Sequence, residues 1–222
     1  RCRALFLDPD ESVIDLADRS VLVGSYFFDA ARDEFDDRDT AHRDTHRCLA
    51  QAMIKGVLAF FTAQDARFAD ARFVNQWLAQ PVWLQALGVR VAQGYGASTP
   101  DDAASVFRAI GYHLGSEVLA DREFSLIDQT LRAEQAELVS FLASYQARIA
   151  DQEHLAYQWL RIHSGHGGGV EADHFEWATR GARLAFGYTP REHHAALRRQ
   201  LHHGFRAFAS DHAEFFSSAA LD

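Results

Sequence analysis

The sequence predicts an all-α protein, a bundle of about seven or eight helices in one domain over residues 1–222. Apolar residues recur every three or four positions along most of the chain, which is the spacing that places them on one face of a helix. Three of the four prolines stand where a helix should begin, and proline suits a first helical turn but disrupts an interior. No segment combines period-two alternation with the β-branched enrichment that a strand needs.

In the N-terminal half, helix-capping residues and a helix-breaking proline predict where the helices begin and end. A first helix is expected after a cap at Asp8 or Asp10, and a second covers residues 36–65. A third helical segment over residues 66–96 should bend at Pro81, because proline cannot continue a straight helix there.

The C-terminal half begins at the clearest helix start of the chain, Thr99-Pro100-Asp101-Asp102. A helix follows it, and a long helical region then runs from about Arg132 to Ile162. The break at Gly165–Gly169 separates that region from a further helix that extends to Phe186. Pro190 lies in the first turn of a closing helix.

Composition excludes several classes of protein. The 222 residues are 48% hydrophobic and carry a net charge of −9 with no basic run, so neither nucleic acid nor an anionic membrane surface is an expected partner. The two cysteines, Cys2 and Cys48, are too far apart in sequence for a zinc motif and form no disulfide framework. No apolar stretch reaches the length of a membrane span, about 18 residues, and no signal peptide is visible. A cytoplasmic location fits best.

Two predicted helices place a glutamate and a histidine on an apolar stripe. Val106 and Ile110 define a stripe whose next members are His113 and Glu117, one turn apart. An acid on such a face must be paired, hydrogen-bonded or bound to a cation, because an isolated buried charge costs several kcal/mol or more.

The helix after the glycine break repeats this arrangement. Glu171 and His174 are three residues apart, and the rest of their face is alanine and glycine, which lets a partner helix approach closely. Glu-x-x-His is the spacing by which helical bundles present a carboxylate and an imidazole to a pair of metal ions. Any one of these pairs can be structural, and His163 can instead bond the end of the preceding helix. The coincidence of two such helices favours a metal site.

The phrases "GYHLGSEVLADREFSLIDQTL" and "IHSGHGGGVEADHFEWATRGARLAF", with the closing "GFRAFASDHAEFF", resemble the heme-oxygenase-like dimetal oxidases. These proteins belong with the iron-containing redox enzymes and the TenA-like helical fold. The resemblance covers the C-terminal half, whereas residues 1–100 match only in helical character. It implies a heme-oxygenase-like bundle that binds Fe(II), two ions per chain, uses O₂ as co-substrate and oxidises a small molecule such as an amino acid or an amine, often in natural-product biosynthesis.

The resemblance also implies a ligand set. Glu117 and Glu171 are the expected carboxylate ligands and His174 an imidazole ligand, with His113 and His163 as further candidates. Histidine and carboxylate ligands with open positions suit non-heme Fe(II) and leave room for O₂. The family usually adds a glutamate from an early helix; there this chain offers only the residues Asp70, Gln76 and Gln80. A site with one metal ion, or one that draws in Asp39 or His46, is therefore an open alternative.

The same fold also supports other functions. A heme oxygenase needs a proximal histidine, for which His42 or His46 would serve, and a thiamin hydrolase needs a nucleophilic cysteine in its pocket; both rank below the dimetal interpretation. The main alternative is a metal-free helical binding or scaffolding protein. In it Glu117 would be neutralised by His113 or by an arginine such as Arg180, and Glu171 would cap its helix. A homodimer is compatible with the sequence.

Overall fold

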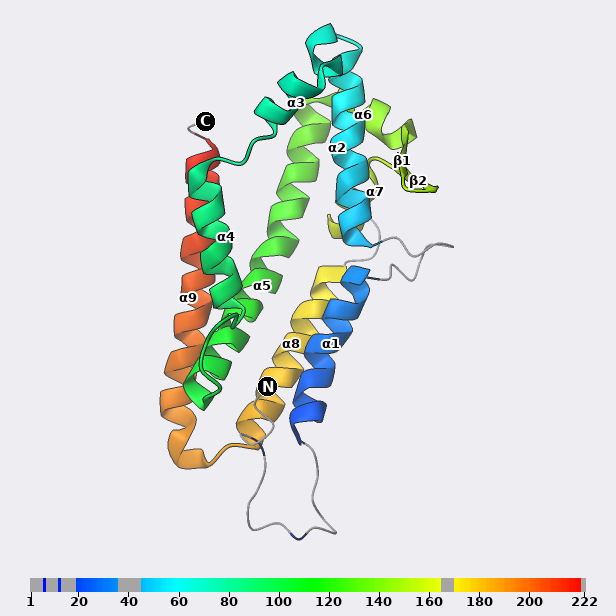
Figure 1. Cartoon of the computed structure of the whole chain (residues 1–222). Coiled ribbons are helices and arrows are strands. Elements are labelled where there is room, and N and C mark those ends of the chain that lie inside the picture. The colour runs from blue at the N-terminus through cyan, green and yellow to red at the C-terminus, as the bar shows by residue number, and fades with distance from the viewer. Residues whose placement is uncertain (1–5, 7–11, 13–18, 36–44, 165–169, 221–222) are drawn as a thin grey trace. The chain divides into compact units, whose positions relative to one another are not determined.

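The computed structural model (Figure 1) describes residues 6, 12, 19–35, 45–164 and 170–220. Within this part of the chain there are nine α-helices, short 3₁₀ turns and one two-stranded hairpin. The helices are α1 (Arg19–Phe35), α2 (His46–Thr62), α3 (Ala71–Trp77), α4 (Val82–Gly94), α5 (Ala103–Glu134), α6 (Ala136–Ser144), α7 (Gln158–His163), α8 (Val170–Gly187) and α9 (His194–Ala219). The hairpin consists of β1 (Gln146–Ile149) and β2 (Gln152–Leu155).

The prediction of a mostly helical protein is confirmed. Helix α5 begins at Ala103, and the Asp102 carboxylate accepts a hydrogen bond of 2.7 Å from the amide of Ser105. The segment around Pro81 is broken rather than bent, because α3 ends at Trp77 and α4 begins at Val82. The caps expected at Asp8 or Asp10, and the residues Asp39 and His42, lie outside the described residues.

The prediction of continuous helix from Arg132 to Ile162, and of no strand, is wrong over residues 146–155. The antiparallel hairpin there pairs Ala147 with His154, and both are buried between exposed neighbours. Each strand has only four residues, which is too short to show a period, and the turn lacks the Asn-Gly or Asp-Gly signal of a hairpin. Instead Ala150 adopts a φ of 54°, a conformation that glycine reaches more easily.

The chain divides into two compact units. Unit 1 comprises Arg1–Ala30, Pro81–Leu119 and Ala172–Asp222, and unit 2 comprises Ala31–Gln80 and Ala120–Glu171. The single domain over residues 1–222 stays a prediction. Among the described residues, no helix is both long and apolar enough to cross a membrane.

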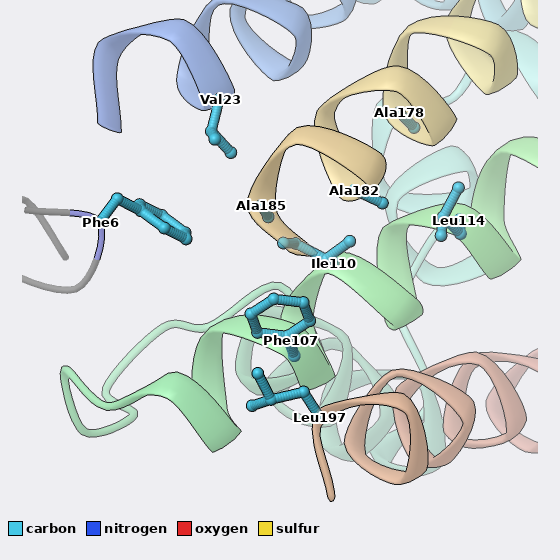
Figure 2. Close-up of a cluster of buried hydrophobic side chains, with 9 residues drawn as sticks. All are labelled: Phe6, Val23, Phe107, Ile110, Leu114, Ala178, Ala182, Ala185 and Leu197. Carbon is cyan, nitrogen blue, oxygen red and sulfur yellow. The ribbon is translucent and has the colours of Figure 1, made fainter. Parts of the chain in front are cut away.

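The core of unit 1 lies between α5, α8 and α9, with contributions from α1 and from Phe6 (Figure 2). The alanine line that the sequence predicts on α8 is buried: Ala178 and Ala185 are fully buried and Ala182 nearly so. Beside this line Gly181 lies so close to Phe27 of α1 that a Cβ there would be 2.8 Å from its ring. The remaining buried members of the cluster are Val23, Phe107, Ile110, Leu114 and Leu197.

Helices α5 and α9 touch through their backbones. A Cβ at Gly111 would lie 1.9 Å from the carbonyl oxygen of Leu201, and a Cβ at Gly204 would lie 1.8 Å from that of Arg108. No L side chain fits at such distances, so glycine is required on both helices at this crossing. The approach sets the separation of α5 and α9, and so the spacing of every side chain between them.

The core of unit 2 packs α2 against α6, α7 and the hairpin. It contains one fully buried charge, Asp128 of α5. The Tyr157 hydroxyl donates a short hydrogen bond to one oxygen of Asp128, and Arg132 Nε donates to the other at 2.8 Å. The two donors offset the cost of burying this carboxylate. Burial and the neighbouring Asp128 raise the pKa of Tyr157 above its usual range. The buried apolar residues of this cluster are Leu138, Val139, Leu142, Ala156, Tyr157 and Leu160.

Replacing Gly204 tests the crossing of α5 and α9. We expect Gly204→Ala to lower the free energy of unfolding by about 3 kcal/mol or more, at the upper end of overpacking effects, because the new methyl group meets backbone that cannot move aside. Gly88→Ala is the matched control, since Gly88 is an exposed helical glycine with nothing within 4 Å of its added Cβ. That change should raise stability by about 0.5–1 kcal/mol. Urea denaturation followed by circular dichroism measures both, and similar small effects would contradict the close crossing.

Candidate functional site

Glu117 lies between two histidines from different helices. Its Oε1 is 3.3 Å from Nδ1 of His113, one turn earlier on α5, and its Oε2 is 3.5 Å from Nδ1 of His174 on α8. The His113–Glu117 pair follows from helical spacing alone, whereas His174 reaches Glu117 because α8 packs on α5. We call His113, Glu117 and His174 the His–Glu–His cluster. It belongs entirely to unit 1.

The cluster is buried but not sealed. The side chain of His174 is 2% exposed, that of Glu117 11% and that of His113 18%. His113 is therefore the most exposed of the three side chains, although its Nε2 is buried. A carboxylate at this depth needs compensation, and the two imidazoles are the groups that face it.

Aromatic rings surround the two imidazoles. The ring of Phe27 lies edge-on to His113 at 5.5 Å between centroids, and Tyr95 lies at 6.0 Å. Trp177 lies 5.6 Å from His174 on the same helix. These rings restrict the orientation of the imidazoles and lower the local polarity, which strengthens electrostatic interactions within the cluster.

Burial dominates the acid–base behaviour of His113. It lowers the pKa of His113 below the ordinary value of 6.5, the neighbouring Glu117 opposes that shift, and His174 adds to it. His113 is therefore neutral at neutral pH. Its Nδ1 faces a carboxylate oxygen and so carries the ring proton, while its buried Nε2 has no hydrogen-bond partner among the described residues.

The donor set and its distances fit metal ligation. Two ligand atoms bound at about 2.1 Å to one ion are about 3.0–3.5 Å apart at octahedral or tetrahedral angles, and both Nδ1–oxygen distances fall in this range. Each histidine faces a different oxygen of Glu117. In the described part of the chain, however, no group of three or more His, Cys, Asp or Glu residues is arranged to hold a metal ion.

The other two predicted ligands are not in the cluster as described. His163 is the last residue of α7 in unit 2, where its Nδ1 lies 2.6 Å from the carbonyl oxygen of Trp159. It thus bonds the end of its own helix, as the structural alternative expected. Glu171 is in the first turn of α8, but its side chain lies outside the described residues, so its role stays a prediction.

Two further expectations can be compared with the structure. Asp70 was one of the residues offered in place of the glutamate that the family takes from an early helix. In the structure it caps α3 by accepting a hydrogen bond of 2.8 Å from the amide of Arg72. Arg180, considered as the counter-ion of Glu117, pairs instead with Glu176 one turn away on α8. The described residues that face Glu117 are therefore histidines.

Sequence reasoning missed a polar network beside the cluster. The hydroxyl of the buried Tyr112 donates to Asp211 Oδ2 at 2.9 Å, and Arg90 Nε donates to Asp211 Oδ1 at 3.1 Å. Burial and this carboxylate raise the pKa of Tyr112 above its usual range. Asp211 lies beside the apolar stripe of α9, so the signal was present, but its partners lie on two other helices.

Comparison with known proteins gives no match: no family model matches the chain, and no curated protein or solved structure is significantly similar to it.

Removing the charge of Glu117 tests the electrostatics of the cluster. We expect Glu117→Gln to move the pKa of His113 further below 6.5 in the metal-free protein, because Glu117 is the group that raises it. The ring resonances of His113 in a pH titration by nuclear magnetic resonance measure this shift. Glu176→Gln, which removes an exposed carboxylate on α8, should leave the pKa unchanged.

The same pKa shift predicts how stability depends on pH. Because the pKa of folded His113 is lower than that of the unfolded chain, the unfolded state binds more protons once the pH falls below 6.5. The contribution of His113 to stability is thus complete above pH 6.5 and is lost as the pH falls from there toward the folded pKa. Glu117→Gln should deepen this loss at pH ~5, measured by urea denaturation; an unchanged pH profile would contradict the assignment.

Proposed function

We propose that this chain is a non-heme iron oxidase or oxygenase that uses O₂ to oxidise a small molecule such as an amino acid or an amine. One observation carries the proposal: Glu117 presents one carboxylate oxygen to each of two histidines from different helices. The resemblance of the C-terminal half to heme-oxygenase-like dimetal oxidases supports the proposal. Three parts of the proposal rest on that resemblance alone: the heme-oxygenase-like fold, the second iron and a role in natural-product biosynthesis.

The residues have separate roles in this proposal. Glu117, His113 and His174 would hold the iron through the carboxylate oxygens and imidazole nitrogens that face one another. Glu171 would supply the second carboxylate. Iron, when bound, provides the oxygen chemistry that protein side chains lack. His163 is left out of this ligand set because its Nδ1 bonds the carbonyl oxygen of Trp159 and it has no described contact with the cluster.

The protein side chains would prepare the site for the metal. The low pKa of His113 keeps it neutral, so that its Nδ1 could bind a metal ion once the ring proton has moved to Nε2, without the loss of a second proton. The rings of Phe27, Tyr95 and Trp177 would restrict water around the reacting centre. The partial exposure of His113 gives the route by which ions and a small substrate would enter.

A metal-free binding or scaffolding protein is the second candidate. The specific observation in its favour is that the two histidines face both oxygens of Glu117, which can offset the buried charge by hydrogen bonding. In that case the cluster would serve to orient α5 against α8.

Metal content decides between the two candidates. We expect anaerobic loading with Fe(II) to give about two irons per chain by elemental analysis, and admission of O₂ to give a transient absorbance. His174→Ala and Glu171→Ala should abolish iron binding, whereas Glu176→Ala, an exposed position on α8, should leave it intact.

Each result of the iron-loading experiment has one interpretation. A wild-type chain that binds no iron would overturn the oxidase proposal and favour the metal-free protein. Full iron occupancy in both His174→Ala and Glu171→Ala would show that the ligand set is wrong even though iron binds.

A further inference from the structure

Helix α9 carries basic side chains on its exposed side. Its buried residues are Leu197 and Gly204, and Gly204 packs against the backbone of α5. Because successive residues of a helix are rotated by about 100°, the side opposite to these two residues carries five positions within an arc of about 140°. All five are exposed, and together we call them the basic face of α9: Arg198, Arg199, His202, His203 and Arg206.

No carboxylate neutralises this face among the described residues. Residues 193–210 contain three arginines and four histidines but neither aspartate nor glutamate. Within the described part of the chain none of the three arginines forms an ion pair, and Arg198 lies instead over the ring of Phe186, at 6.0 Å from its centroid. Arg108 of α5 adds a fourth guanidinium beside the face, since it donates to Oε1 of Gln200 at 2.8 Å. That amide is neutral, so the positive charge of Arg108 also stays uncompensated by it.

The order of charges along α9 does not stabilise the helix. The helix dipole favours acidic side chains near the N-terminus and basic ones near the C-terminus. In α9 the order is reversed, because the arginines lie in its N-terminal half whereas Asp211 and Glu214 lie in its C-terminal half. The basic face is therefore not explained by the stability of its own helix, and it indicates an anionic partner.

The size of the face limits that partner. Arg198 and Arg206 are eight residues apart, which is about 12 Å along the helix axis. This length matches about four residues of an extended chain or about two turns of a helix. An arginine guanidinium can bond a carboxylate through two parallel N–H···O hydrogen bonds, so a short run of carboxylates fits both the length and the chemistry of the face.

The charge of the rest of the chain disfavours a long polyanion. Without the four arginines of this surface, the formal net charge of −9 becomes −13. A nucleic acid or an anionic membrane extends well beyond 12 Å and would meet this excess of negative charge, whereas a short acidic segment would not.

We propose that the basic face of α9 binds an acidic segment of another protein, a short run of aspartate and glutamate side chains that pair with Arg198, Arg199 and Arg206. Several such pairs on one face act as a network, which contributes more than an isolated surface ion pair. The proposal does not depend on the oxidase function, because the basic face contains no residue of the His–Glu–His cluster.

A labelled peptide of eight glutamates is the probe. Fluorescence anisotropy measures its binding to the purified full chain without a histidine tag, at about 100 mM NaCl. We expect the double change Arg198→Glu and Arg199→Glu to weaken binding at least about tenfold, because two attractive charges become repulsive. Raising NaCl from about 50 mM to about 300 mM should weaken binding to the wild-type chain, since salt screens exposed charges.

The matched control separates the face from the net charge. Arg122 and Arg161 are exposed arginines of unit 2, and replacing both by Glu changes the net charge by the same amount. We expect this control to bind the peptide within about threefold of the wild-type chain, because screened charges away from the face contribute little. Circular dichroism checks that both double variants fold. Where one does not, peptide-induced shifts of the His202 and His203 ring resonances in the wild-type chain decide the question instead.

Four outcomes would overturn the proposal. The first is a wild-type chain that does not bind the peptide, or whose His202 and His203 resonances it leaves unmoved. The second is equal weakening by the control pair, which would show only general attraction to an acidic peptide. The third is tighter binding to a single-stranded oligonucleotide of the same charge, or to phosphatidylserine vesicles, which would assign the face to nucleic acid or to a membrane. The fourth is self-association of the chain in sedimentation that Arg198→Glu with Arg199→Glu abolishes, which would assign the face to a second copy.

Discussion

The backbone contact between α5 and α9 is the constraint on which unit 1 depends. Gly111 and Gly204 let the two helices approach until a Cβ on either would strike a carbonyl oxygen of the other. This approach brings Tyr112 of α5 within hydrogen-bond distance of Asp211 on α9, and Arg90 of α4 completes that network. Another face of α5 presents Glu117 to His174 of α8, whose buried face is lined by alanines.

Under the proposed function, the buried carboxylate of Glu117 would serve two purposes. Without a metal, two imidazoles offset its charge, and with a metal the same Nδ1 and oxygen atoms would become ligands. Protons and metal ions therefore compete for the same atoms, so that metal affinity should fall as the pH falls.

The buried histidines divide between the two units according to their partners. In unit 1 the imidazoles face a carboxylate, which is the combination that suits iron and O₂ chemistry. In unit 2 the Nδ1 of His163 bonds the carbonyl oxygen of Trp159, and its ring packs edge-on against that of His46. The sequence alone does not show which groups face each imidazole, so it does not distinguish the two cases.

The sequence by itself determined what depends on neighbours along the chain. The helical class, the start of α5 after Asp102 and the shared face of His113 and Glu117 all follow from spacing of three or four residues and local capping. The four-residue strands were missed because their pairing, not their sequence, makes them strands. Only the tertiary structure placed His174 against Glu117 and His163 against His46, because these contacts join residues far apart in sequence through helix packing, for which local periodicity carries no information.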